Sequence, residues 1–334
     1  MSPELVFLEG EERRAAALAS WATWHRGQVP RAAYVRHLEA LMASPWGRRS
    51  WRVPALRGAS GRALATMNLF ELHLLCDARP LKIGGIGSLV VAPDLRRLGV
   101  GTVFLEAVHG WLSREDYDGA LLFSGIGTEF YERFGYERLP LRRLAARLRD
   151  WRAEGPPDRG SAHLRPFEPD DLPAVQSLFH TAASQQRLAV LRSRDAWEFQ
   201  RLAAEERRAL RPDLRHPPGF LVAEEDGRVV AYLRCSLHED GRVLQVDDYA
   251  FEAAHGTDVT AMLRTVLESL GDAAPRRPVL IGGVAPSRLR NLVPARHATW
   301  TEAGEVMMMA SLGSLRVPSG SAPDEHLVWP SDHF

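Results

Sequence analysis

The chain has 334 residues, enough for two domains that each bury a core of their own. Hydrophobic residues make up 45% and charged residues 25% of the sequence, which is typical of a globular protein and excludes a mostly disordered or collagen-like chain. Basic and acidic residues number 42 each, so no overall charge would attract nucleic acid or an anionic membrane. No apolar run is long enough to span a bilayer, and we expect a cytoplasmic protein without nucleic-acid or membrane partners.

The two cysteines do not form a recognisable motif. Cys76 and Cys235 are far apart, lack a CxxC partner and lie in apolar or strand-like stretches. We expect buried free thiols rather than a disulfide or a metal site. No metal is predicted.

The first half of the chain alternates between helical and extended patterns. Apolar residues have helical spacing at 11–24 and 31–42, and a further helix begins at Gly99. Extended patterns occur at 50–56, 63–75, 82–91 and 119–123. A short helix is expected at 128–134, and an extended or irregular segment at 136–144. This order predicts an α+β domain in which a mixed, mostly antiparallel sheet carries flanking helices.

The same order recurs after a segment rich in glycine and proline. Helices are expected at 173–182, 196–210 and 257–270, and strands at 219–224, 228–237 and 243–251. The sequence therefore predicts an N-terminal domain at 1–152, a linker at 153–161, a second domain at 162–315 and a C-terminal tail at 316–334.

A strand, a turn and a helix meet between Val91 and Gly101. Pyrophosphate binding needs several backbone N–H groups that point at one place, and a tight turn opening a helix supplies them at the positive end of the helix dipole. Gly99 and Gly101 have no Cβ atom, so the backbone can adopt left-handed angles and approach phosphate oxygens closely. Arg96 and Arg97 can add charge-assisted hydrogen bonds. The P-loop and dinucleotide motifs fit worse, because neither GK[ST] nor GxGxxG follows.

The pattern Val91-x-Pro93-x-x-Arg96-x-x-Gly99-x-Gly101 resembles the acetyl-CoA motif of the GNAT N-acetyltransferases. The resemblance implies that acetyl-CoA is a co-substrate and that the backbone of the strand contacts its pantetheine arm. The residues it assigns to the strand contact are Leu89, Val90 and Val91. Those it assigns to the pyrophosphate are Arg97, Leu98, Gly99, Val100, Gly101 and Thr102, with charge added by Arg96.

The stretch 122–136 resembles the second GNAT signature, a strand and loop followed by FYxxxGY. By this resemblance Tyr131 is a catalytic residue that protonates the leaving thiolate, a role that suits a phenol because it is neutral near pH 7. Ser124 could bond to the pantetheine or the substrate, or cap the turn.

The general base stays open at the sequence level. The acceptor amine must be deprotonated before it attacks, and no carboxylate lies between Gly84 and Val91. Glu71, Glu129, His109 and a water relay are the alternatives.

The second half lacks the signature of the first. The segment 253–257 has neither the arginine nor the paired glycines, so we expect one cofactor site per chain. Two GNAT-like copies resemble the first two domains of the Eis-type acetyltransferases. Those proteins bring the chain terminus to the active site, which makes the carboxylate of Phe334 a second catalytic candidate.

Together these features predict an enzyme that transfers acetyl from acetyl-CoA to an amine of a small molecule or protein by direct attack. The alternatives are a non-catalytic acyl-CoA-binding or regulatory module and a scaffold of two decayed copies. Acceptor identity stays open, and exposed apolar surface on the second domain would favour a homo-oligomer.

Overall fold

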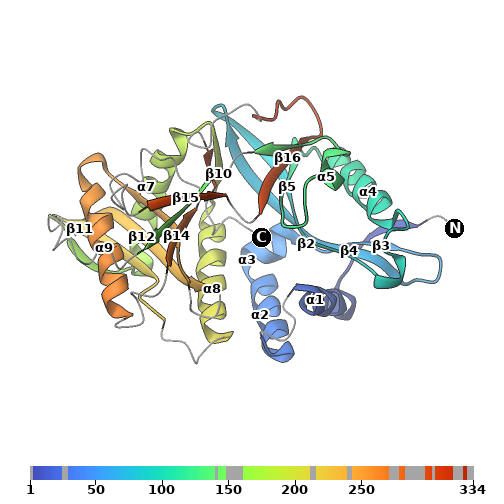
Figure 1. The fold of residues 1–334 in the computed structure, drawn as a ribbon, viewed down its shortest axis with the longest axis horizontal. Helices are drawn as coiled ribbons and strands as arrows, with labels where there is room; N and C mark the ends of the chain where they lie inside the picture. The colour runs from blue at the N-terminus through green and yellow to red at the C-terminus, as the bar shows by residue number, and fades with distance from the viewer. Residues whose placement is uncertain are drawn as a thin grey trace.

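The computed structural model describes residues 3–24, 29–139, 142–147, 161–210, 216–238, 243–270, 278–282, 298–302, 305–318 and 326–328. In these ranges two mixed β-sheets lie side by side, and helices cover their faces (Figure 1). None of the helices there has the length and apolar character of a segment that crosses a membrane. Cys76 and Cys235 are both buried and free, as predicted.

The first sheet is built mainly from the first half of the chain. Its strands run in the order β1 (Glu4–Phe7), β3 (Pro54–Arg57), β4 (Ala63–Cys76), β5 (Arg79–Val91), β6 (Gly119–Ser124), β16 (Val306–Ser311) and β7 (Tyr136–Leu139). Helices α1 (Gly10–Trp24) and α2 (Arg31–Ala43) pack on one face, and α4 (Val100–Arg114) packs on the other (Figure 1). Two short elements, α3 (Pro45–Ser50) and α5 (Glu129–Glu132), complete this half.

The second sheet has the same plan. Its strands run in the order β9 (His163–Pro166), β11 (Phe220–Glu225), β12 (Arg228–His238), β13 (Val243–Phe251), β14 (Pro278–Gly282), β8 (Arg142–Arg147) and β15 (Ala298–Glu302). Its helices are α7 (Leu172–Ser184), α8 (Arg194–Leu210) and α9 (Gly256–Ser269). Along these two seven-strand orders each sheet has one parallel pair, β5 with β6 and β13 with β14, and antiparallel pairs elsewhere. The repeat predicted from the sequence is therefore present as two sheets of equal topology.

The two halves exchange one strand each. β8 follows β7 in the chain but inserts between β14 and β15 of the second sheet. β16 follows β15 but inserts between β6 and β7 of the first sheet. Each inserted strand runs antiparallel to both of its neighbours. The exchange is therefore reciprocal, and the two sheets keep the same sequence of strand directions.

The exchange corrects the assignment of strands to the two halves. The segment 136–144, predicted as one extended run, contains β7 in the first sheet and the start of β8 in the second. β10 (Leu188–Leu191) also joins the first sheet beside β4, and β17 (His326–Leu327) from the predicted tail pairs with β10. Residues 148–160 lie outside the described ranges, so the linker stays a prediction, but the sheets do not divide at 152 and 162.

The exchanged strand β16 is buried on both faces. Met307, Met308 and Met309 have no exposed surface. Because side chains alternate along a strand, Met307 and Met309 join the core below α2, whereas Met308 joins the core below α4. The first half of the molecule therefore completes both of its cores with residues from the end of the chain.

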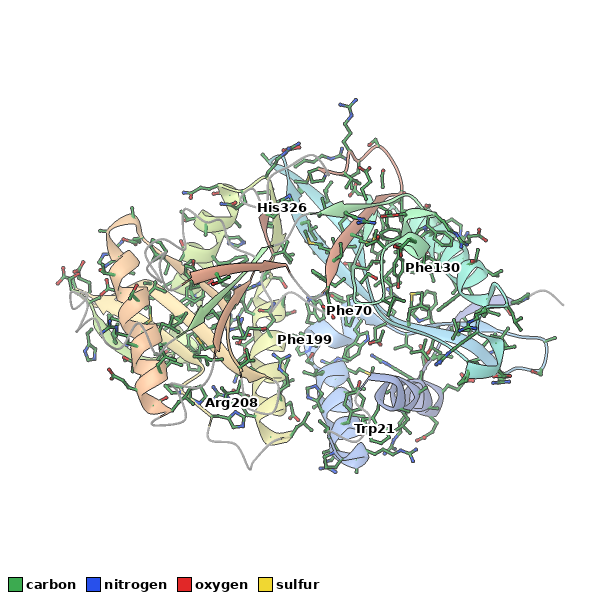
Figure 2. The ribbon with its side chains drawn as sticks, in the orientation of Figure 1. Trp21, Phe70, Phe130, Phe199, Arg208 and His326 are labelled. Carbon is green, nitrogen blue, oxygen red and sulfur yellow. The ribbon has the colours of Figure 1, made fainter. Side chains whose placement is uncertain are left out.

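The two halves also meet through helices. Phe199 of α8 lies with its ring centroid 4.4 Å from Trp46 of α3 and 6.3 Å from Trp51, and Trp51 packs against Phe70 at 5.1 Å. Figure 2 shows Phe70 and Phe199 between the two sheets. This aromatic contact covers apolar surface that either half alone would expose.

A polypeptide of residues 1–152 should not unfold cooperatively, because it lacks β16. Burial of three methionines contributes roughly 5 to 9 kcal/mol, which is comparable with the whole stability of a domain, about 5 to 15 kcal/mol. Appending residues 305–318 through a flexible linker should restore a cooperative urea transition in circular dichroism. The matched control carries serine in place of Met307, Met308 and Met309 and should not restore it. A cooperative transition of residues 1–152 alone would contradict the argument.

Candidate active site

β5 and β6, which run parallel in the first sheet, separate at their carboxyl ends. The last aligned pair is Ile86 with Leu122. Beyond it β5 contains a bulge, since Gly87 pairs with Asn68 whereas Val90 pairs with Thr66, which leaves one extra residue on β5. At the bulge Ser88 has a φ of 49°. A bulge bends its strand, and here β5 leaves β6 and opens a wedge in the sheet.

A cavity of about 580 Å³ occupies this wedge. β5 and the turn and helix after it form one side, with Ile86, Gly87, Ser88, Leu89 and Val91 from β5 and Leu95, Arg96, Arg97, Gly99, Gly101 and Thr102 from the turn and α4. β6 and its loop form the other side, with Leu122, Phe123, Ser124, Gly125 and Ile126. The remaining lining residues are Phe130 and Tyr131 of α5, Arg133 after it, and Glu305, which precedes β16. Figure 2 shows Phe130 beside this region of the first half. The size suits a small-molecule or cofactor site.

The turn before α4 brings a helix N-terminus to the cavity. Gly99 is the N-cap residue and has a φ of 81°, and Arg97 has a φ of 66°. The first amides of a helix have no acceptor within it, so those after Gly99 are available at the positive end of the dipole. Gly101 is helical, and a Cβ there would lie 3.6 Å from Phe130 and from Val91, an ordinary contact. Packing alone does not require glycine at 101, but a ligand that approaches the backbone closely would.

Three arginines make the cavity wall positive. Arg96 donates from Nε to the carbonyl of Val91 at 3.3 Å, and Arg133 donates to the Thr102 hydroxyl at 3.3 Å. Arg97 also lines the cavity, whereas Glu305 supplies the one carboxylate among the described lining residues. The wall therefore favours an anionic ligand such as a pyrophosphate.

Tyr131 lines the same cavity from α5. The side chain is 7% exposed, and its ring packs edge-on against Phe130 at 5.0 Å and Tyr136 at 5.8 Å. Burial raises the pKa of Tyr131 above its ordinary value, so the phenol stays protonated at neutral pH. A buried, protonated hydroxyl at a cavity wall is a suitable proton donor.

His109, Glu71 and Glu129, the side chains considered as general bases, lie in different surroundings. His109 is partly buried on α4 with Nε2 2.9 Å from the Tyr136 hydroxyl, and burial lowers its pKa to about 4, so it is neutral at pH 7. Glu71 accepts a hydrogen bond from the Tyr117 hydroxyl at 3.0 Å and pairs in register with Gly84, before the wedge opens. Neither His109 nor Glu71 lines the cavity, and Glu129 does not line it either.

Most of the residues predicted from the sequence converge on this cavity. Those that line it are Leu89, Val91, Arg96, Arg97, Gly99, Gly101, Thr102, Ser124 and Tyr131. Val90 points to the opposite face of the sheet, Leu98 is 70% exposed, and Val100 packs against the core. The Ser124 hydroxyl donates to the carbonyl of Gly127, so it also holds the loop. Phe334 lies outside the described residues.

Sequence reasoning missed two charged residues of the cavity. Arg133 follows Tyr131 by two residues, so its place in the second signature was a signal that could have identified it. Glu305 comes from the far end of the chain, and only the insertion of β16 beside β6 brings it to the wedge.

The corresponding place in the second half is built differently. The turn before α9 has no left-handed glycine, since Gly256 has a φ of −61°. Asp258 in the first turn of α9 is fully buried, accepts a hydrogen bond from the Ala162 amide at 3.1 Å and lies 2.9 Å from Nδ1 of His255. A carboxylate at the helix N-terminus would repel a phosphate, which agrees with one cofactor site per chain.

Comparison with known proteins gives a family match for one part of the chain. Residues 50–139 match the model of the acetyltransferase (GNAT) domain, and these residues contain the turn, Tyr131 and every described lining residue of the wedge except Glu305. This stretch of the chain is therefore similar to the GNAT acetyltransferase domain. No curated protein matches the chain in sequence.

Solved structures share the fold over both sheets. A protein from Enterococcus faecalis described as a probable N-acyltransferase has 12% identity and a TM-score of 0.69, with 93% of this chain and 73% of that chain covered. N-myristoyltransferase from Saccharomyces cerevisiae with bound myristoyl-CoA has 14% identity and a TM-score of 0.58, with 92% and 82% covered. Eis1 from Mycobacterium abscessus has 15% identity and a TM-score of 0.57, with 93% and 73% covered. At these identities the likeness shows the fold, which agrees with two GNAT-like units.

Substituting Gly101 with alanine should separate ligand binding from folding. Alanine is favoured over glycine in a helix by about 0.5 to 1 kcal/mol, so thermal stability should be unchanged or slightly raised. The Kd for CoA, measured by isothermal titration calorimetry, should rise at least about tenfold, since a methyl group would occupy the space of a phosphate oxygen.

The matched control is Gly99→Ala. Because Gly99 is left-handed, alanine there should cost roughly 1 to 2 kcal/mol of folding free energy. If Gly101→Ala binds CoA as tightly as the unsubstituted protein, the helix N-terminus is not the phosphate site.

Proposed function

We propose that this protein is an acetyl-CoA-dependent N-acetyltransferase that acts on an amine. The observation that carries the proposal is the convergence on one cavity of an open helix N-terminus, three arginines and a buried, protonated tyrosine. The GNAT domain supports acyl transfer from CoA as the reaction class. The sequence motif from Val91 to Gly101, which resembles the acetyl-CoA motif, supports acetyl as the group transferred.

The residues that line the wedge have two roles. Gly99, Gly101 and Thr102 present backbone amides to the pyrophosphate, and the arginines neutralise its charge. The open edge of β5 beyond Ile86 offers backbone N–H and C=O groups to the pantetheine amides, because β6 no longer pairs with it. Positioning of the thioester against the wedge reduces the entropy cost of the reaction.

Tyr131 acts on the leaving group. When bound, acetyl-CoA supplies a thioester whose carbonyl carbon forms a bond to the amine nitrogen while the carbon–sulfur bond breaks. Tyr131 gives its phenolic proton to the departing sulfur and regains a proton from solvent, and the amine nitrogen loses its extra proton to water. Burial supports this role because it keeps the Tyr131 pKa raised and the phenol protonated.

Tyr131→Phe should lower kcat for acetyl transfer by about 10²-fold or more, since a proton donor is lost. The KM for acetyl-CoA should change little, because the ring and its packing against Phe130 and Tyr136 remain. Thiol release measured with a panel of amines checks both values. Tyr136→Phe, which removes a hydroxyl bonded to His109, is the matched control and should keep kcat within a few fold.

An unchanged kcat for Tyr131→Phe would contradict its assignment as proton donor. Absence of turnover in the unsubstituted protein with every amine, together with tight CoA binding, would support a non-catalytic acyl-CoA-binding module instead. Absence of any CoA binding would support a scaffold.

The role of Phe334 stays a proposal that rests on the resemblance to Eis-type enzymes. β17 joins the first sheet through β10, so residues 326 and 327 lie on the half that holds the wedge. Deletion of residues 329–334 should lower kcat by at least about tenfold while the Kd for acetyl-CoA stays within about twofold, since a base acts on the amine and not on the cofactor. Steady-state kinetics and titration calorimetry measure these values, and unchanged kinetics would remove Phe334 from the site.

A further inference from the structure

A second large cavity lies across the sheet from the cofactor wedge. It has a volume of about 520 Å³ and lies between α1 and the ends of β4 and β5. Because side chains alternate along a strand, Val90 faces this cavity while Leu89 and Val91 face the wedge. Its lining, which we call the α1 trough, consists of Leu8, Glu12, Ala15, Ala16, Ala19, Ala22, Ala63, Leu64, Ala65, Thr66, Val90, Ala92, Pro93 and Arg96.

The α1 trough is apolar and open to solvent. α1 contributes four alanines to it, which leave space where larger side chains would close the gap to the sheet. Ala15, Ala19 and Ala22 are exposed, so a ligand can enter along α1 without passing through the cofactor wedge. A separate entrance lets a second substrate enter while the cofactor wedge is occupied.

A small cavity lies beside both the trough and β5. It has a volume of about 10 Å³, room for one water-sized group, and shares Ala16 and Thr66 with the trough. Its wall also contains Ser88, the bulge residue that lines the cofactor wedge from the other side. A cavity of this size holds a small polar group such as an amino group but not a long acyl chain.

The charges of this region do not suit a polycation. Glu12 is the carboxylate of the trough among the described residues, and both of its oxygens accept from Arg57 at 2.8 Å. Arg96 borders the trough and Arg13 borders the small cavity. Burial lowers the pKa of Arg13, and the same desolvation would favour the neutral form of an amine brought there.

We propose that the α1 trough binds the apolar body of the acceptor, and that the acceptor is a monoamine with an aliphatic or aromatic body rather than a polyamine or an aminoglycoside. The body lies along α1, and the amino group reaches the back of Ser88 through the small cavity. An amine held there is neutral and nucleophilic without a carboxylate base beside it. The proposal rests on the acetyltransferase function and adds the class of its acceptor.

The test compares 2-phenylethylamine with spermidine, using the full chain in the presence of CoA. By titration calorimetry, 2-phenylethylamine should bind at least tenfold more tightly than spermidine. Ala19→Phe places a ring in the middle of the trough and should weaken 2-phenylethylamine binding at least tenfold, while the Kd for acetyl-CoA stays within twofold. Leu18→Phe is the matched control on the same helix, outside both linings, and should change neither value more than twofold.

Tighter binding of spermidine, or equal binding of 2-phenylethylamine to Ala19→Phe and the unsubstituted chain, would overturn the proposal. The proposal would also be overturned if the unsubstituted protein did not bind 2-phenylethylamine although its titration with CoA showed that it was folded. Failure of the acetyltransferase function has another signature. Thiol release would then be absent with every amine, while binding of 2-phenylethylamine would persist and stay sensitive to Ala19→Phe.

Discussion

The parting of β5 from β6 is the constraint on which the rest of the site depends. Up to Ile86 and Leu122 the two strands are parallel and paired, and beyond that point the bulge at Ser88 turns β5 away. Parallel strands expose their carboxyl ends at one edge, so the helix that follows β5 starts beside the gap. A cofactor wedge, a helix N-terminus and an unpaired strand edge therefore arise together from one local irregularity.

The second half retains this irregularity without the site. On β13 the pairing with β12 shifts between Val246 and Asp248, and the pairing with β14 ends at Val246, as on β5. Asp248 is fully buried and accepts hydrogen bonds from Arg192 at 2.7 Å and Arg234 at 3.0 Å. Breaking such a buried pair by removing one partner leaves an uncompensated charge, so these residues fix the separated strand in place. The same backbone plan thus holds an ion cluster in one half and opens to solvent in the other.

The local features were predictable from the sequence, and the long-range ones were not. The turn at Gly99, the helix after it and Tyr131 follow from patterns within a few residues, and all were found. Leu89, Val90 and Val91 were assigned by resemblance to backbone contacts with the pantetheine arm, and strand periodicity places the Val90 side chain on the opposite face from those of its two neighbours. The insertion of β16 has no local signal, because an apolar run such as Met307 to Met309 indicates a buried strand without indicating its sheet.

This exchange also links the chemistry of the first half to the fold of the second. Glu305 reaches the wedge because β16 is paired with β6, and the chain passes directly from β15 of the second sheet to β16 of the first. The loop between β15 and β16 is too short for the two halves to separate while both strands stay paired. A displacement of the second half would therefore pull on β6, one side of the wedge. The strand that follows the second sheet in the chain thus supports one side of the wedge and brings Glu305 to its wall.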